Sequence, residues 1–184
     1  KYSDNGHAAH LIGYVSEVSI KDLENDEFLR EIHIPGLKTG KNGLEKSLNK
    51  KMIGKAGFQR FEVNAYGKRV KELKFMEGTV GESFRTTLDN EVQKFSGELI
   101  KDKSGSVCVI DIYTGDVVVM VSSPTFDANQ FVHGMSSEDW KNLIQNPRKP
   151  LMNKSISGLY PPGSTIKPIV ALSALEADVI SPKL

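Results

Sequence analysis

The feature that most restricts the fold of this chain is a pair of stretches rich in Val and Ile, residues 106–112 and 116–122. The residues between them, Tyr113-Thr114-Gly115-Asp116, are typical of a tight hairpin turn. The second stretch is apolar almost throughout, which is the pattern of a strand that is covered on both faces. We therefore predict an antiparallel hairpin whose second strand lies in the core.

Helices are predicted on both sides of this hairpin. Val92, Phe95 and Leu99 fall at i, i+3 and i+7, which is one stripe of a helix over residues 89–100. A capping box beginning at Ser136 predicts a second helix that ends before Pro147. An apolar helix is predicted from residue 164 to about 176.

The first half of the chain is predicted to be richer in strands. The sequence favours strands at residues 10–15, 32–34, 58–63, 68–75 and 83–88, a polar inserted turn over 21–27, and a short helix over 44–52. The composition changes near residues 85–105. We therefore expect one domain over residues 1–85 and another over 86–184.

Composition excludes several classes of protein. With 39% hydrophobic and 26% charged residues among 184, the chain is neither disordered nor fibrous. Its longest apolar run, Val117 to Val121, is too short to span a membrane. The single cysteine, Cys108, excludes an internal disulfide framework. Because residues 1–4 show neither an initiator Met nor a signal peptide, we expect a piece of a longer protein whose anchor or export signal lies elsewhere.

Charge is distributed unevenly, but it does not indicate a nucleic-acid site. Residues 38–74 carry eleven Lys and Arg against three Asp and Glu. Lysines outnumber arginines nineteen to five along the chain, although Arg is the usual partner of bases and phosphates. We interpret the basic segment as a solvated face and expect no nucleic-acid partner. His7-x-x-His10 lies in a predicted strand, so no metal site is expected there.

Two segments fit the pattern Ser-x-x-Lys, which is one arrangement of a serine nucleophile and its base. They begin at Ser47 and at Ser164. Chance alone predicts about two matches in a chain of this composition, so the surroundings must decide between them. Ser47 lies among lysines in a segment that we expect to be exposed to solvent. A solvated lysine stays protonated, so Lys50 would not act as a base for Ser47.

The surroundings of Ser164 favour chemistry. Tyr160-Pro161-Pro162-Gly163 forms a stiff turn, and the predicted helix would place the Ser164 hydroxyl in the positive field of its N-terminus. Lys167 lies three residues on, on the same helix face. To act as a base, its pKa must fall by about three units from 10.4, or about 4 kcal/mol. Burial away from water lowers the pKa of a lysine, and we expect Ile166, Ile169 and Val170 to bury the Lys167 amine in this way.

Residues 158–168, Gly-Leu-Tyr-Pro-Pro-Gly-Ser-Thr-Ile-Lys-Pro, resemble the active-site signature of the class B penicillin-binding proteins, in particular their elongation-type members. Further stretches resemble the same family in the same order along nearly the whole chain. They are residues 10–15, 40–46, 86–89, 109–111 with 114–115, 122–127 and 150–154.

The resemblance implies an α+β fold. Residues 1–85 would belong to a β-rich pedestal of the dimerisation type. Residues 86–184 would begin a β-lactamase-like transpeptidase domain with helices on an antiparallel sheet. The family's S-x-N and K-[ST]-G motifs should follow Ser164, and the chain reaches Leu184 without them. Lys38-Thr39-Gly40 and Ser47-Leu48-Asn49 match these patterns but precede Ser164, so we interpret them as coincidences. We expect the 184-residue segment by itself to be inactive.

The resemblance also implies a function, a peptidoglycan D,D-transpeptidase that cross-links stem peptides during cell elongation. Ser164 would attack the D-Ala-D-Ala bond or a β-lactam ring, and its backbone N–H would form half of the oxyanion hole. Lys167 would be the general base. Neither a cofactor nor a metal is implied. Elongation-complex proteins would bind the pedestal, and a single-pass anchor would hold the catalytic part on the periplasmic side of the inner membrane.

Two alternatives remain open at this point. The segment could act mainly as a docking module for cell-elongation partners. The parent protein could instead be a β-lactam sensor or a β-lactamase-like protein, since these share the S-x-x-K pattern. The long segment that precedes Ser164 argues against a stand-alone β-lactamase.

Overall fold

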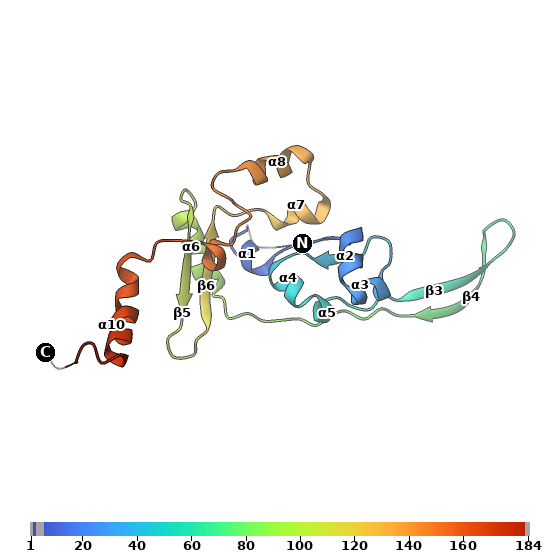
Figure 1. The fold of residues 1–184 in the computed structure, drawn as a ribbon. Coiled ribbons are helices and arrows are strands. Elements are labelled where there is room, and N and C mark those ends of the chain that lie inside the picture. Colours follow the sequence, from blue (N-terminus) through green and yellow to red (C-terminus); the bar gives the residue numbers. More distant parts are fainter. Residues whose placement is uncertain (1, 3–5, 183–184) are drawn as a thin grey trace.

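The structure, a computed structural model, describes residue 2 and residues 6–182. Helices and two-stranded antiparallel sheets alternate along these residues (Figure 1). The predicted α+β class is therefore confirmed. No helix among the described residues is long and apolar enough to cross a membrane.

The first fifty residues are more helical than predicted. They form α1 (Ala9–Ile12), β1 (Val15–Glu17), α2 (Ile20–Asn25), α3 (Glu27–Ile32), β2 (Lys38–Gly40), α4 (Gly43–Ser47) and α5 (Asn49–Met52). The strand predicted at 10–15 is wrong except at Val15, because residues 10–12 belong to α1. The strand predicted at 32–34 is also wrong, because Ile32 ends α3 and residues 33–34 form neither helix nor strand. The predicted turn over 21–27 is also wrong. Ser19 starts α2 with a reciprocal capping box, and the Asp26 side chain caps α3, so both helices begin at capped ends.

A long hairpin extends from this part of the molecule (Figure 1). Its strands, β3 (Phe58–Val63) and β4 (Arg69–Met76), confirm the prediction at 58–63 and nearly match that at 68–75. Many of its apolar side chains are exposed, among them Leu73 and Phe75. The strand predicted at 83–88 is wrong, since these residues form no ladder and return along the molecule to α6.

The Val- and Ile-rich hairpin is present as predicted, as β5 (Gly105–Ile110) and β6 (Val117–Ser123). Val119 and Val121 of β6 are buried. Helix α6 (Asn90–Ile100) packs against the hairpin and confirms the helix predicted over 89–100. The face it buries is Gln93, Ser96 and Gly97, however, and the predicted stripe of Val92, Phe95 and Leu99 is exposed.

Gln93 explains why α6 buries a polar face. Its side-chain amide donates to the Met120 carbonyl and accepts from the Met120 N–H, both at 2.8 Å. It also donates to the His7 carbonyl at 2.8 Å. The amide thus completes the outer edge of β6 much as a neighbouring strand would, and it ties the N-terminal segment to the sheet.

The core connects the two halves of the chain. Ala9 of α1 packs with Phe126 and with Ala128 of α7 (Ala128–His133). The rings of Tyr14 and Phe131 stack beside them, with centroids 3.9 Å apart. Helix α8 (Ser137–Gln145) is capped by Ser136, as predicted.

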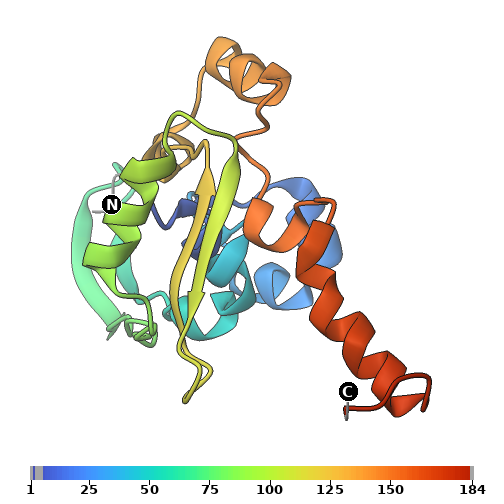
Figure 2. The ribbon, with the colours of Figure 1, turned by 90° about the vertical axis from the view of Figure 1, so that its left-hand side faces the viewer.

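The last elements lead to the candidate site. They are α9 (Lys154–Ser157), the 3₁₀ turn η1 (Gly163–Ile166) and α10 (Lys167–Glu176). Helix α10 projects from the rest of the molecule in both ribbon views (Figures 1 and 2).

Candidate active site

The segment from α9 to Ser164 is shaped by two glycines. A Cβ at Gly158 would lie 2.3 Å from the Tyr160 ring and 2.5 Å from the Lys154 carbonyl oxygen, so only glycine fits there. Gly163 has a φ of +55°, which favours glycine, and open space around its Cα. Glycine is therefore favoured at position 163 for its backbone conformation, which directs the chain into η1, and not for lack of space.

Ser164 and Lys167 lie one turn apart. Ser164 is in η1, Lys167 is the first residue of α10, and the Lys167 N–H donates to the Ser164 carbonyl. The Ser164 side chain is exposed. Among the described residues, neither its hydroxyl nor its N–H makes a hydrogen bond, so both are available to a substrate.

The helix start differs in detail from the prediction. Residues 163–166 form a 3₁₀ turn, and the α-helical bonding begins at Lys167. Ser164 is still at the N-terminal end of the helical segment, where the unpaired N–H groups point. Pro168 occupies the first turn of α10 and removes no helix bond there.

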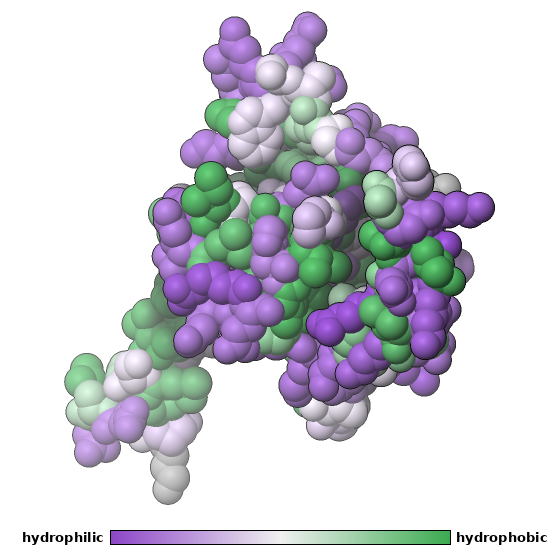
Figure 3. All heavy atoms as spheres, turned by 90° about the vertical axis from the view of Figure 1, so that its right-hand side faces the viewer, coloured by the Kyte–Doolittle hydropathy of each residue, from purple (hydrophilic) through white to green (hydrophobic). Residues whose placement is uncertain are grey.

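The predicted apolar cover is wrong for the described residues. Ile166, Ile169 and Val170 are 40%, 60% and 58% exposed, and Lys167 is exposed beside them. The reason is the projection of α10 from the molecule. In Figure 3 this projecting segment, at the lower left, is largely hydrophobic at its surface.

The two segments that match the K-[ST]-G and S-x-N patterns, residues 38–40 and 47–49, lie close together elsewhere, around a cavity of about 720 Å³. Thr39, Gly40, Ser47 and Asn49 all line it, and the Gly40 N–H donates to Asn49 Oδ1 at 3.1 Å. All of the cavity's lining residues lie between positions 21 and 51, so it contains neither Ser164 nor Lys167. Ser47 donates its hydroxyl to the Gly43 carbonyl and holds no activated arrangement.

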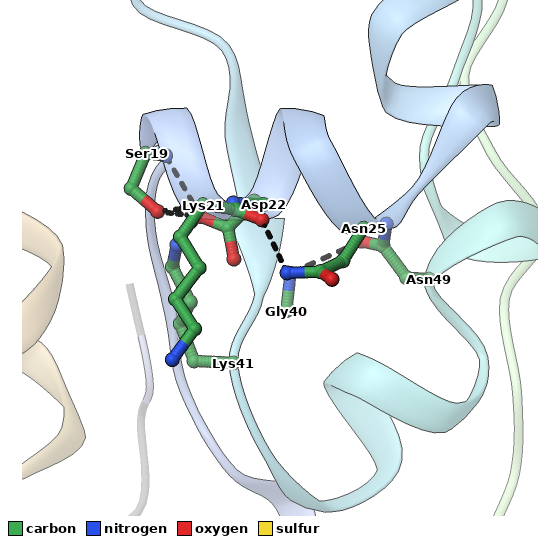
Figure 4. A network of polar contacts seen from close by, with 7 residues as sticks. All are labelled: Ser19, Lys21, Asp22, Asn25, Gly40, Lys41 and Asn49. Carbon is green, nitrogen blue, oxygen red and sulfur yellow. Dashed lines mark hydrogen bonds and ion pairs between the residues drawn. The ribbon is translucent and has the colours of Figure 1, made fainter.

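One wall of this cavity is a charged network around Asp22 (Figure 4). Its carboxylate accepts from the Ser19 N–H and hydroxyl at 2.7 and 2.6 Å and pairs with Lys41. Partial burial raises the pKa of Asp22, but the hydrogen bonds from Lys41 and Ser19 outweigh it and lower the pKa to about 2. The ionised carboxylate therefore stabilises the folded state.

This pKa gives a testable pH dependence. The stabilisation by Asp22 is fully present above its unfolded pKa of about 3.9, and it is lost as the pH falls towards about 2. We expect Asp22→Asn to be less stable than the parent at pH 6 and to lose less stability between pH 5 and 2. Urea unfolding at several pH values measures this. Parallel curves for the two proteins would contradict it.

The sequence analysis assigned no role in the site to the residues just before it. Lys154 is buried, and its ammonium donates to the Lys149 carbonyl at 3.1 Å. Burial and then the charge of Arg148 lower the pKa of Lys154. The polar run Asn153-Lys154-Ser155 directly before the glycine-rich turn was the available signal. His10, which the sequence placed in a strand and which was considered as a metal ligand, instead contacts the Pro150 carbonyl.

Two family models match the chain in sequence order. The dimerisation domain of penicillin-binding proteins matches residues 1–86, and their transpeptidase domain matches residues 105–183. Together they account for most of the chain. It therefore belongs to the penicillin-binding proteins, and the resemblance found in its residues is confirmed.

Within that family the similarity points to one type of member. The peptidoglycan D,D-transpeptidase MrdA of Escherichia coli is 38% identical over 98% of this chain, and that of Haemophilus influenzae is 36% identical over 95%. The matches span 29% and 27% of those proteins, so this chain covers under a third of their length.

Solved structures agree. The penicillin-binding protein PBP2 of Helicobacter pylori, in its complex with MreC, superposes with a TM-score of 0.83 at 34% identity, over all of this chain and 34% of that one. PBP2 of Pseudomonas aeruginosa gives 0.77 at 30% identity, over 97% of this chain and 35% of that one. The chain is thus similar in sequence and fold to PBP2 proteins.

Proposed function

We propose that the protein containing this chain is a peptidoglycan D,D-transpeptidase that cross-links stem peptides through an acyl-enzyme on Ser164. The observation that carries the proposal is the placement of this serine. It is exposed, follows a glycine with positive φ, opens a helical segment and has Lys167 one turn further on. The relatives that match nearly the whole chain are D,D-transpeptidases by name.

The chemistry follows from these positions. Ser164 Oγ attacks the carbonyl carbon of the terminal D-Ala-D-Ala bond while Lys167 takes the hydroxyl proton. The Ser164 N–H, free among the described residues, stabilises the oxyanion that forms. D-Alanine leaves with a proton, and Ser164 holds the acyl group. An amine from a neighbouring stem peptide then attacks the ester, forms the cross-link and frees the serine. A β-lactam ring is opened by the same first step.

The remaining parts of the site are proposed to lie in the longer protein. We expect the S-x-N and K-[ST]-G motifs, and the apolar cover of Lys167, to come from segments that follow residue 184. We propose the domain boundary that the sequence composition indicates, with the pedestal over residues 1–85 and the transpeptidase domain from residue 86. The 184-residue segment alone should not react with penicillins.

The experiment that tests the proposal is intact-mass measurement after incubation with benzylpenicillin. The full-length protein is expected to gain one penicillin mass, and peptide mapping should place it on the peptide containing Ser164. The isolated segment, incubated in parallel, should gain none. A folded full-length protein without any adduct would overturn the proposal, and rapid release of hydrolysed penicillin would instead favour a β-lactamase-like protein.

Docking is proposed as a second function, performed by the pedestal. The PBP2 of Helicobacter pylori, to which this chain is similar, has been solved in a complex with MreC. We propose that the pedestal binds an elongation-complex protein of the MreC type. We also propose that a single-pass anchor before residue 1 holds the catalytic part on the periplasmic side of the inner membrane.

The exposed apolar side chains of the β3–β4 hairpin provide a test of docking. Leu73 and Phe75 are 58% and 61% exposed. We expect Leu73→Asp to weaken binding of an MreC-type partner at least tenfold in a pull-down titration while acylation by penicillin stays unchanged. Ile112→Asp, the same kind of change at a still more exposed position (86%) in the transpeptidase match, is the control and should affect neither. Unchanged partner binding by Leu73→Asp and Phe75→Asp would argue against this surface.

A further inference from the structure

Helix α1 is joined to the chain that leads into the candidate active site by a buried histidine. His10 is 8% exposed, and its Nε2 lies 2.6 Å from the Pro150 carbonyl oxygen. A carbonyl can only accept, so Nε2 carries the hydrogen and Nδ1 is the bare nitrogen. The ring also meets the Phe126 ring edge-on, with centroids 5.1 Å apart. The imidazole therefore has one fixed orientation.

A second contact links α1 to the same segment. The Asn153 side-chain amide donates to the His10 carbonyl at 3.4 Å. Its oxygen accepts from the Ser155 N–H at 3.1 Å and so caps α9. One residue thus connects α1 to the first turn of α9.

The opposite side of the segment is fixed to β6. The Lys154 N–H donates to Ser122 Oγ at 3.0 Å, and that hydroxyl donates to the Met152 carbonyl at 3.1 Å. Ser155 Oγ donates to the Val121 carbonyl at 2.9 Å. Residues 150–155 are therefore held between α1 and strand β6.

Residues 150–155 are followed closely in the chain by the candidate nucleophile, Ser164. Helix α9 ends at Ser157, and residues 158–163 connect it to Ser164. His10 lies in the part matched by the dimerisation-domain model, whereas Pro150 and Ser164 lie in the part matched by the transpeptidase model. A displacement of α1 would therefore move Pro150 first. The movement would then pass through α9 to residues 158–163, which connect α9 to Ser164.

We propose that His10 is a positioning residue of the acyl-transfer site, and that its hydrogen bond to Pro150 couples the position of α1 to that of Ser164. The proposal rests on the proposed function of Ser164. It assigns to the dimerisation part of the chain a direct hold on the catalytic segment, besides any docking role.

The surroundings of His10 support the neutral, singly protonated ring that this role requires. Nδ1 is buried and has no hydrogen-bond partner among the described residues. Burial lowers the pKa of His10, the hydrogen bond to Pro150 raises it, and the nearby charge of Lys154 lowers it again, with a net lowering. A second ring proton would therefore enter a buried position that offers it no acceptor.

The test compares two substitutions in the full-length protein. His10→Leu keeps the bulk and removes the donor, whereas the amide nitrogen of His10→Gln can reach the position of Nε2. Acylation by a fluorescent penicillin, followed at several concentrations, separates the affinity from the acylation rate constant. For His10→Leu we expect an acylation rate constant about tenfold lower, which is about 1.4 kcal/mol of barrier, with little change in affinity. His10→Gln should restore most of the rate.

Hydrogen exchange supplies a readout that does not depend on activity. Peptides covering residues 150–163 should exchange faster in His10→Leu than in the parent, and close to the parent in His10→Gln. Leu29→Ala, a buried change in α3 away from the junction, is the control for general destabilisation. It should lower the melting temperature but leave the acylation rate constant and the exchange of these peptides unchanged.

Each result bears on the proposal. An acylation rate and exchange like those of the parent in His10→Leu would overturn it, and so would an equal loss in Leu29→Ala. If His10→Leu does not fold, Asn153→Asp keeps an oxygen that caps α9 and replaces the donor to the His10 carbonyl by a carboxylate oxygen. It should then show a smaller change in the same direction, and no change there would overturn the coupling. If the parent folds but is never acylated, the proposed function fails, while exchange still decides whether His10 fixes the segment.

Discussion

Ser164→Ala is expected to abolish covalent labelling of the full-length protein by penicillin. The parent should gain one penicillin mass within minutes, and the variant should gain none after prolonged incubation, a loss beyond the detection limit of intact-mass measurement. The reason is direct, since the hydroxyl forms the bond that is measured. Ser164 is exposed and its hydroxyl bonds to nothing among the described residues, so its removal should leave the fold intact.

The chain contains its own matched control for this change. Ser47 is also followed by a lysine at i+3, and it is exposed. Its hydroxyl donates to the Gly43 carbonyl within α4, and its surroundings are the cavity of the dimerisation part. Ser47→Ala should therefore be labelled at the parent's rate. An adduct that persists in Ser164→Ala, or disappears in Ser47→Ala, would show that the nucleophile has been assigned to the wrong serine.

The structure shows why local patterns located some elements and not others. The hairpins β3–β4 and β5–β6 are formed by neighbouring residues around turn sequences, and the start of α8 by a cap at Ser136. These determinants lie within a few residues, so the sequence predicts them. Helices α1 to α3 have four to six residues each, too few to be stable alone. Local caps at Ser19 and Asp26 begin α2 and α3, but helices this short also depend on packing against the rest of the molecule.

The features of the candidate site also fall into those that local sequence predicts and those that depend on distant contacts. The pairing of Ser164 with Lys167 follows from a spacing of three residues, and the structure places them one turn apart. Burial of Ile166, Ile169 and Val170 was predicted from their apolar character, but burial depends on what packs against α10. The contact of His10 with Pro150 joins residues 140 apart in sequence, and nothing in either neighbourhood indicates it.

Lys167→Met is expected to lower the acylation rate constant of the full-length protein by about 10³-fold. General base catalysis of this kind contributes 10²- to 10⁴-fold, and the serine hydroxyl alone is a weak nucleophile. Affinity for the penicillin before acylation should change little, because the base acts on the serine proton. Stopped-flow fluorescence with a labelled penicillin separates the two quantities. Lys50→Met, the same change in the other Ser-x-x-Lys segment, is the control and should acylate like the parent.

Lys167→Arg distinguishes a base from a positive charge. Arginine keeps the charge and most of the length, but it cannot be deprotonated in proteins and so cannot accept the serine proton. If Lys167 is the general base, Lys167→Arg should lose nearly as much rate as Lys167→Met. If the lysine served only to attract the penicillin carboxylate or to stabilise the oxyanion, Lys167→Arg would keep most of the rate. The base would then have to be sought among residues that pack onto α10 in the longer protein.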